Sequence, residues 1–239
     1  DMLNVKMFTA TVSVTESMTH DIKLLRFKLD DDERISQKPG QYVQIEAPSL
    51  DGPVFRAYSI SSPTYEDDVV ELMVRLVPGG IGSTYLHNLE VGDKVTFTGP
   101  YGEFVLNEDP DTEIICVGGG CGLAPMKNII YSIYDKWPDR SCWLFFGCRG
   151  TADVFYLEEF QELAKKHPNF HVVYALSEPE EGADWDGETG FIHLSVDKML
   201  ESDVARQAFL CGPPLMIEAV TRVLEDKGVP EDEIFYDKF

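Results

Sequence analysis

The fold of this 239-residue chain is indicated most clearly by one stretch, Glu113-Ile114-Ile115-Cys116-Val117-Gly118-Gly119-Gly120-Cys121-Gly122-Leu123-Ala124-Pro125. Its apolar first half is typical of a short buried strand, and residues 123–136 have the apolar periodicity of a helix. The glycines between them allow the backbone to approach a phosphate closely, although a tight turn without a ligand has the same pattern. The stretch is neither a P-loop, because it lacks Lys-Ser/Thr, nor a regular G-x-G-x-x-G motif.

The sequence on either side continues the same alternation of strands and helices. Buried apolar strands separated by helices are typical of a doubly wound parallel sheet, with ligands at the carboxyl ends of the strands. We therefore expect residues 109–239 to form an α/β domain. Strands are expected at 113–117, 142–146, 170–176, 208–211 and 233–236, and helices at 123–136, 156–166, 195–201 and 215–227.

Residues 1–108 have a different pattern, with short alternating strands separated by Gly, Pro and Asp. This spacing predicts an antiparallel β-barrel. The acidic, proline-containing stretch Asn107-Glu108-Asp109-Pro110-Asp111 is the expected linker to the α/β domain. Strands are expected at 8–15, 22–29, 41–47, 54–60, 69–77 and 94–99, with one short helix at 83–89.

The composition excludes several classes of protein. Apolar residues make up 44% of the chain and charged residues 26%, as in ordinary globular proteins. The 20 basic and 42 acidic residues give a net charge of −22, which opposes binding to nucleic acids and anionic membranes. No apolar run approaches the ~18 residues of a membrane-spanning helix. Residues 1–6 lack the features of a signal peptide, and we expect a cytoplasmic protein.

The cysteines and histidines do not form recognisable ligand patterns. The five cysteines are odd in number and include no C-x-x-C pair, so we expect reduced thiols rather than disulfides. The five histidines are scattered singly, and the cysteine spacing differs from that of iron–sulfur proteins. We therefore predict no metal site.

Three further motifs contain residue types that suit nucleotides. Arg56-Ala57-Tyr58-Ser59 ends an expected strand and offers a guanidinium for a diphosphate, although the same arginine on a plain strand would face solvent. Pro78-Gly79-Gly80-Ile81-Gly82-Ser83-Thr84 enters the short helix, where Ser83 has the alternative role of an N-cap. Cys211-Gly212-Pro213-Pro214 joins a strand to a helix, and its cysteine has the alternative role of an inert buried thiol.

The order of these motifs resembles that of the ferredoxin–NADP reductase superfamily. The resemblance rests on Arg56-x-Tyr58-Ser59, Gly80-x-Gly82-Ser83, Gly118-Gly119-Gly120-x-Gly122-x-x-Pro125 and Cys211-Gly212-Pro213-Pro214. Within this superfamily, the second half of the chain is similar to the reductase part of the F subunit of the sodium-pumping NADH:quinone oxidoreductase. The residues that carry this similarity are Phe146-Gly147-Cys148-Arg149, residues 155–160 and 185–193, and the ending Tyr236-Asp237-Lys238-Phe239. That protein carries a membrane helix and a [2Fe–2S] domain that this sequence lacks.

The resemblance implies that residues 1–108 bind FAD. Arg56 would hold its diphosphate, Tyr58 would pack on the flavin, and Ser59 would hydrogen-bond near flavin N5. The other implied FAD contacts are Ala57, Val74 and Arg75 on neighbouring strands and the backbone of Gly80, Ile81, Gly82 and Ser83.

The resemblance also implies that residues 109–239 bind NADH. Cys211 would lie near the nicotinamide C4, and Phe239 matches an aromatic residue that covers the flavin until the nicotinamide displaces it, unless it is simply a frayed chain end. We choose NADH over NADPH because Asp153 would repel a 2′-phosphate, although Arg149 could pair with one. The other implied dinucleotide contacts are Gly119, Gly120, Pro125, Gly147, Cys148 and Gly212.

The implied activity is hydride transfer from NADH to FAD, followed by single-electron transfer to an iron–sulfur domain or protein. Ser59, Cys211 and Phe239 are the implied catalytic residues. The resemblance suggests a module of a respiratory-type chain, at the cytoplasmic face of a membrane as part of a larger complex. Two alternatives stay open: the reductase component of a soluble oxygenase or ferredoxin system, and a non-catalytic FAD protein that receives electrons from a protein partner.

Overall fold

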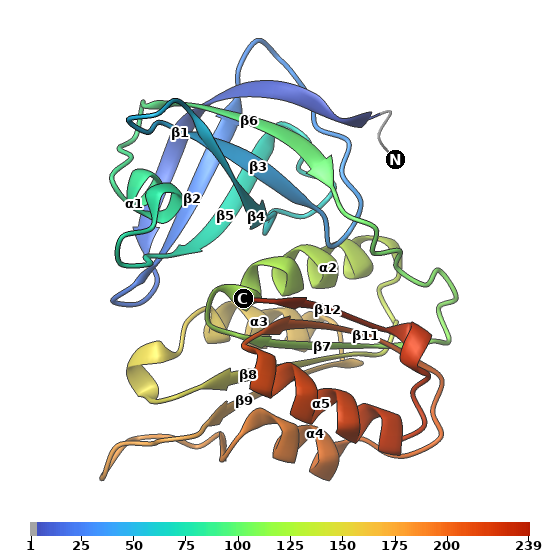
Figure 1. The fold of residues 1–239 in the computed structure, drawn as a ribbon. Helices are drawn as coiled ribbons and strands as arrows, with labels where there is room; N and C mark the ends of the chain where they lie inside the picture. The colour runs from blue at the N-terminus through green and yellow to red at the C-terminus, as the bar shows by residue number, and fades with distance from the viewer. Residues whose placement is uncertain (1–3) are drawn as a thin grey trace. The chain divides into compact units, whose positions relative to one another are not determined.

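The computed structural model describes residues 4–239, which form two compact units (Figure 1). The first unit comprises the chain up to Val105 together with Lys127–Ser132, and the second comprises Leu106–Met126 and Ile133–Phe239. The first three residues of the stretch used to judge a signal peptide lie outside the described residues.

The first unit is built on a six-stranded antiparallel sheet in the order β4-β3-β6-β1-β2-β5. The end strands β4 and β5 approach each other without pairing, so the sheet is a half-barrel. This confirms the predicted antiparallel barrel architecture. The strands are β1 (Lys6–Ser17), β2 (Ile22–Leu29), β3 (Tyr42–Ala47), β4 (Val54–Ser59), β5 (Val69–Arg75) and β6 (Lys94–Tyr101).

Alternation of side chains explains why these segments form strands around one core. On β3 every second residue is buried, namely Val43, Ile45 and Ala47, while their neighbours are half-buried. Such a period of two places one face of the sheet in the core and the other toward solvent. Phe27 and Phe97, which have no exposed surface, fill the centre of this core.

The short helix of the first unit, α1 (Ile81–His87), begins and ends two residues earlier than predicted. Its N-cap is Gly80, whose backbone is extended, and no side chain caps the helix. Ser83 is therefore not an N-cap, and its hydroxyl instead accepts a hydrogen bond from the Val77 N–H at 2.9 Å. This bond closes the glycine-containing turn onto the helix, which explains the earlier start.

A buried ionic cluster lies in the first unit. Glu71 on β5 has 2% of its side chain exposed, and its carboxylate lies 2.6 Å from the ammonium of Lys127 and 2.6 Å from the guanidinium of Arg26. Ser61 donates a third hydrogen bond to Glu71 at 2.8 Å. Lys127 is 9% exposed, so both partners of this ion pair are largely removed from water. Such a pair is stable only while each charge keeps its partner.

The second unit is a doubly wound sheet in the order β10-β9-β8-β7-β11-β12, and all its pairings are parallel. Helices α4 and α5 cover one face, and α2 and α3 cover the other (Figure 1). The predicted fold class is confirmed. The elements are β7 (Glu113–Gly119), α2 (Leu123–Lys136), β8 (Cys142–Cys148), α3 (Leu157–Lys166), β9 (Phe170–Leu176), β10 (Glu188–Thr189), α4 (Ile192–Met199), β11 (Arg206–Gly212), α5 (Pro214–Asp226) and β12 (Ile234–Lys238).

Two elements of this unit differ most from the sequence prediction, while the bounds of the others agree with it within two residues. The two-residue strand β10 is missing from it, because so short a segment has no periodicity to detect. Helix α4 begins three residues earlier than expected because Phe191, with an extended backbone, is its N-cap. Ile192 and Val196, four residues apart, then face the core together.

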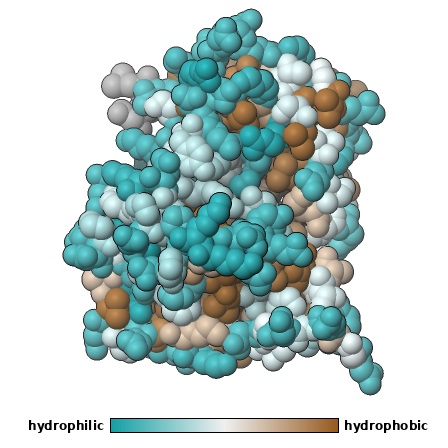
Figure 2. All heavy atoms as spheres, turned by 180° about the vertical axis from the view of Figure 1, so that it is seen from behind, coloured by the Kyte–Doolittle hydropathy of each residue, from teal (hydrophilic) through white to brown (hydrophobic). Residues whose placement is uncertain are grey.

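The surface is mostly hydrophilic on the face drawn in Figure 2, with scattered apolar patches. This hydrophilic surface agrees with the composition, in which 26% of the residues are charged, 42 of them acidic and 20 basic. Among the described residues, no helix has the length and apolar character that crossing a membrane requires.

Candidate functional site

Arg56, Tyr58 and the first turn of α1 lie together in the first unit. Arg56 and Ala57 are exposed on β4, whereas Tyr58 and Ser59 are half-buried. The Arg56 guanidinium donates a hydrogen bond to the Phe55 carbonyl at 3.0 Å, and no described carboxylate forms an ion pair with it. In a chain with such an excess of acidic residues, this arginine is available to bind an anion.

Gly82 brings the backbone of α1 against these two side chains. A Cβ atom at this position would lie 2.7 Å from Cγ of Arg56 and 2.9 Å from the Tyr58 hydroxyl. Both distances are shorter than real Cβ contacts, so only glycine fits without displacing Arg56 or Tyr58. The predicted residues Arg56, Tyr58 and Gly82 thus form one contiguous surface, which is suited to a diphosphate next to a flat ring.

The other predicted residues of the first unit have less direct access. Ile81 is exposed and Ser83 is buried inside the turn. Val74 has no exposed surface, because its side chain belongs to the barrel core and its carbonyl lies 2.7 Å from His87 Nε2. Arg75 pairs with Asp21 at 3.4 Å. Val74 therefore presents neither its side chain nor its backbone to a cofactor in this structure.

The strand order of the second unit brings two predicted motifs together. Strands β8, β9 and β10 follow on one side of β7, and β11 and β12 lie on its other side, so the strand order reverses between β7 and β11 and creates a topological switch point. Gly118 and Cys211 are register partners at the carboxyl ends of these strands. Ligands of open α/β sheets bind at this point, because the loops leave it in opposite directions and open a crevice.

Among the glycines at the switch point, Gly122 is the one that a close backbone contact requires. A Cβ atom at Gly122 would collide with the backbone carbonyl of Cys211, and one at Gly212 would lie 2.5 Å from Cε of Met216. At Gly119 the nearest atom would be Sδ of Met216, at an ordinary 3.4 Å. The two turns therefore pack backbone against backbone. The sequence gives no sign of the contact made by Met216, since a methionine on a helix is usually a core residue.

Cys211 is 3% exposed, and burial raises the pKa of its thiol well above the usual value, with a further contribution from Asp237. The thiol is therefore neutral at physiological pH and is a small apolar surface rather than a nucleophile. Phe239 donates its backbone N–H to the Gly212 carbonyl at 3.2 Å, which places the last residue beside this motif. Its side chain is 47% exposed.

The predicted residues after β8 lie at the next strand end. A Cβ atom at Gly147 would lie 3.3 Å from Ile192. Cys148 is buried, and this burial raises the pKa of its thiol to about 12. Arg149 is exposed and forms no ion pair with any described residue. Asp153 accepts a hydrogen bond from the Gly150 N–H at 3.2 Å, so its carboxylate is directed toward its own loop.

The carboxylate that reaches this loop from outside belongs to Glu180, which no motif in the sequence indicates. Both of its oxygens contact the Thr151 backbone N–H, at 3.2 and 3.3 Å, and one accepts the Thr151 hydroxyl at 3.2 Å. The two residues are 29 positions apart, and no local pattern connects them.

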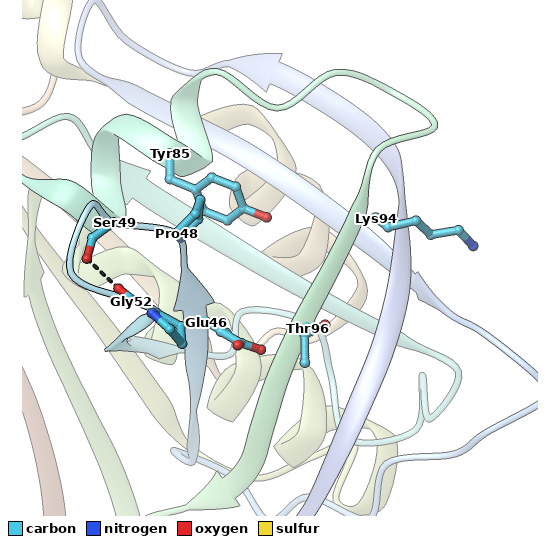
Figure 3. Close-up of a pocket in the computed structure, with 8 residues that line it drawn as sticks. Glu46, Pro48, Ser49, Gly52, Tyr85, Lys94 and Thr96 are labelled. Atoms are coloured by element: carbon cyan, nitrogen blue, oxygen red, sulfur yellow. Dashed lines mark hydrogen bonds between the residues drawn. The ribbon is translucent and has the colours of Figure 1, made fainter.

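A pocket of about 470 Å³ also lies on the first unit, and Tyr85 of α1 is in its lining. Figure 3 shows Tyr85 at one side of it and Lys94 directed away, where its ammonium bonds Thr11 at 2.7 Å and Asp30 at 3.1 Å. No residue predicted from the sequence lines it. Its lining residues are Glu46, Pro48, Ser49, Gly52, Pro53, Tyr85, Lys94 and Thr96.

Comparison with known families assigns a domain type to each part of the chain. Residues 9–106 match the oxidoreductase FAD-binding domain, and residues 116–222 match the oxidoreductase NAD-binding domain. The first range runs from within β1 to beyond the end of β6, and the second runs from within β7 to within α5.

Similar proteins are reductases with further parts. The chain is 36% identical to the reductase component of phenol 2-monooxygenase from Pseudomonas sp. (strain CF600), over 97% of its own length and 65% of that protein. It is 33% identical to the F subunit of the Na⁺-translocating NADH-quinone reductase of Neisseria meningitidis, covering 100% of this chain and 69% of that protein. The crystal structure of the cytochrome P450 reductase GcoB from Amycolatopsis has a TM-score of 0.88 at 33% identity, covering 98% of this chain and 70% of the other.

The chain thus spans 65% of the length of the phenol 2-monooxygenase reductase component. Both matched domain types, the strand orders and the four ordered motifs agree with one another. We conclude that the chain consists of an oxidoreductase FAD-binding domain and an oxidoreductase NAD-binding domain and belongs to the ferredoxin reductase family.

Proposed function

We propose that this chain oxidises NADH with a bound FAD and supplies single electrons to an iron–sulfur acceptor. When bound, FAD would supply the chemistry that converts a hydride into two separately transferable electrons. The observation that supports the proposal most directly is the meeting of the Gly118–Gly122 turn with Cys211 at the switch point.

In the first unit, the residues present fit FAD. The guanidinium of Arg56 would bind the diphosphate with two parallel hydrogen bonds, and Tyr58 would pack on the flavin. Gly82 would keep the backbone of α1 close enough to donate its N–H groups. The half-buried hydroxyl of Ser59 would donate a hydrogen bond to a flavin ring nitrogen. Ala57, Arg75, Gly80, Ile81 and Ser83 complete the proposed contacts, and Val74, which has no exposed surface, supports the strand beneath them.

In the second unit, the residues present fit a nicotinamide dinucleotide. The N–H groups of Gly119 and Gly120 would bind the diphosphate at the start of α2, in which Pro125 lies. The neutral thiol of Cys211 would leave room for the nicotinamide ring, and Phe239 would give way to it. Gly147, Cys148, Arg149 and Gly212 complete the proposed contacts.

Two settings fit the relatives. One is a module of a membrane-bound NADH:quinone oxidoreductase, supported by the 33% identity to the F subunit from Neisseria meningitidis. The other is the reductase component of an oxygenase, supported by the 36% identity to the phenol 2-monooxygenase component. Because this chain has a net charge of −22, a free acidic acceptor would be repelled, and we favour an acceptor that is tethered or part of the same assembly.

The proposal is tested by anaerobic absorbance spectra of the purified protein loaded with FAD. We expect NADH to bleach the flavin bands within seconds and NADPH to do so much more slowly. With ferricyanide as a one-electron acceptor, two acceptor molecules should be consumed per NADH. A protein that binds FAD but is reduced by neither dinucleotide would instead be a carrier supplied by a protein partner, and a protein that binds no FAD would contradict the proposal entirely.

Arg56→Ala is expected to weaken FAD binding about 10–100-fold, because a charged hydrogen-bonding partner of the diphosphate contributes roughly 1.5–3 kcal/mol. The measurement is the dissociation constant from flavin fluorescence titration. Arg34→Ala is the matched control, because Arg34 pairs only with surface carboxylates. If Arg56→Ala and Arg34→Ala bind FAD with equal affinity, Arg56 does not contact the FAD diphosphate.

A further inference from the structure

The carboxyl ends of β8 and β9 continue as paired backbone beyond the sheet. Ser177 donates its N–H to the Cys148 carbonyl at 2.9 Å, and Glu178 donates to the Arg149 carbonyl at 2.8 Å. This pairing carries the segment after β9 alongside the loop after β8. As a result, Glu180 reaches Thr151 although the two belong to different strand connections.

The Glu180 carboxylate occupies both hydrogen-bond donors of Thr151, the backbone N–H and the hydroxyl. It also lies against Gly150, where a Cβ atom would collide with it. Hydrogen bonds from the backbone N–H groups of Glu180 itself and of Thr151 lower the pKa of this carboxyl, so it is charged at neutral pH. The loop thus presents a fixed negative charge where its own donors would otherwise be open to an anion.

The position of this loop relates it to the adenosine ribose. In a doubly wound sheet the dinucleotide lies across the switch point, and residues after the second strand contact the ribose 2′ position. Here β8 is the second strand and pairs directly with β7. An acidic residue at such a place accepts the 2′-hydroxyl of NAD, whereas an arginine favours the 2′-phosphate of NADP. The exposed Arg149 would favour NADPH, so the proposed preference for NADH requires an acidic residue near the ribose.

We propose that Glu180 determines the preference for NADH by accepting the ribose 2′-hydroxyl and excluding a 2′-phosphate. This inference rests on the proposed dinucleotide site. Its physical basis is that a phosphate next to this carboxylate would face a like charge and would find the donors of Thr151 already occupied. Asp153 contributes less to excluding a 2′-phosphate, because its carboxylate accepts a hydrogen bond from the Gly150 N–H and is directed toward its own loop.

The test is Glu180→Gln, which keeps the shape of the side chain and removes its charge. Glu181→Gln is the matched control, because it removes the same charge from the next residue, which is also exposed and has no contact with Thr151. Binding of 5′-AMP and of 2′,5′-ADP to the FAD-loaded protein is measured by calorimetry. Flavin reduction by NADH and NADPH is measured in parallel by stopped-flow absorbance.

We expect Glu180→Gln to bind 2′,5′-ADP at least about 10-fold more tightly than wild type, with 5′-AMP changed by less than about 3-fold. The gain should shrink as salt is raised from about 0.05 to about 0.5 M, because a charge effect is screened. Glu181→Gln should resemble wild type.

Two results would overturn the inference. If Glu180→Gln and Glu181→Gln bind 2′,5′-ADP equally well, while NADH still reduces the flavin, Glu180 has no special role and the proposed function stands. If neither nucleotide binds wild type or variant and NADH leaves the flavin oxidised, the inference and the proposed dinucleotide site fall together.

Discussion

Replacing Glu71 with alanine is expected to lower the free energy of unfolding by about 3–5 kcal/mol, the largest single-residue effect we expect in the first unit. The substitution removes the carboxylate that lies 2.6 Å from the ammonium of Lys127, whose side chain is 9% exposed. It also removes one of the two carboxylates bound by Arg26 and the acceptor of the Ser61 hydroxyl. Removing the opposite charge from such surroundings is costly, because the low exposure of the lysine leaves little room for water to replace the lost carboxylate.

Glu66→Ala is the matched control for this prediction. Glu66 also pairs with Arg26, at 2.9 Å, but its side chain is 34% exposed. Its removal should cost less than about 1 kcal/mol, since water replaces the lost partner. Urea denaturation of both variants, followed by circular dichroism, gives the comparison. If Glu71→Ala loses no more stability than Glu66→Ala, the buried cluster does not stabilise the fold.

The same cluster predicts a pH dependence. Burial alone would raise the pKa of Glu71, but the charge of Lys127 and the hydrogen bonds from Lys127, Arg26 and Ser61 outweigh burial and lower it. A carboxyl group with a lowered pKa contributes stability above its unfolded-state pKa of about 4.3, and this contribution is lost as the pH falls through the folded-state value. The stability difference between wild type and Glu71→Ala should therefore be constant from about pH 7 to about pH 5 and shrink in more acidic buffer.

Gly122→Ala is expected to abolish most reduction by NADH while leaving FAD bound. The added methyl group would collide with the backbone carbonyl of Cys211, which cannot rotate away because it belongs to β11. Overpacking of this kind costs about 3 kcal/mol. The Gly118–Gly122 turn would move relative to Cys211, and a displacement of roughly 1 Å in a positioning element lowers a rate about 100-fold.

Two measurements separate the parts of this prediction. Stopped-flow absorbance gives the rate of flavin reduction, and flavin content after gel filtration gives FAD retention, which we propose to depend on Arg56 and Gly82 of the other unit. Gly119→Ala is the control for stability, since its new atom would have neighbours no closer than 3.4 Å. An unchanged melting temperature and rate in Gly122→Ala would show that the close packing at the switch point is unimportant.

Most elements of the fold are predictable because each has a local signature. Strand β9 and helix α2 have the bounds predicted from apolar pattern alone, since a buried run and a periodicity of 3.6 are both visible in sequence. The start of α1 differs from the prediction because it depends on the bond between Ser83 and the Val77 N–H, which a pattern of glycines does not reveal.

The candidate site is predictable only in its local parts. Arg56, Gly82 and Cys211 belong to motifs with recognisable order, and the structure shows which atoms each approaches. Glu180 could not be found in this way, because its role depends on the pairing of segments that follow two different strands. Contacts between distant loops are set by topology, and the residue types at their tips carry no matching pattern.

Helix α2 has a consequence for the order in which the chain can fold. It is continuous from Leu123 to Lys136, yet its Lys127–Ser132 turns belong to the half-barrel unit. That unit is therefore discontinuous along the chain. Glu71 can form its ion pair with Lys127 only after that residue, 56 positions downstream, has been synthesised. During synthesis the six strands can emerge and pair, but their buried acid is neutralised fully only once the first strand and turn of the next unit have left the ribosome. A fragment that ends at the linker would lack this lysine permanently.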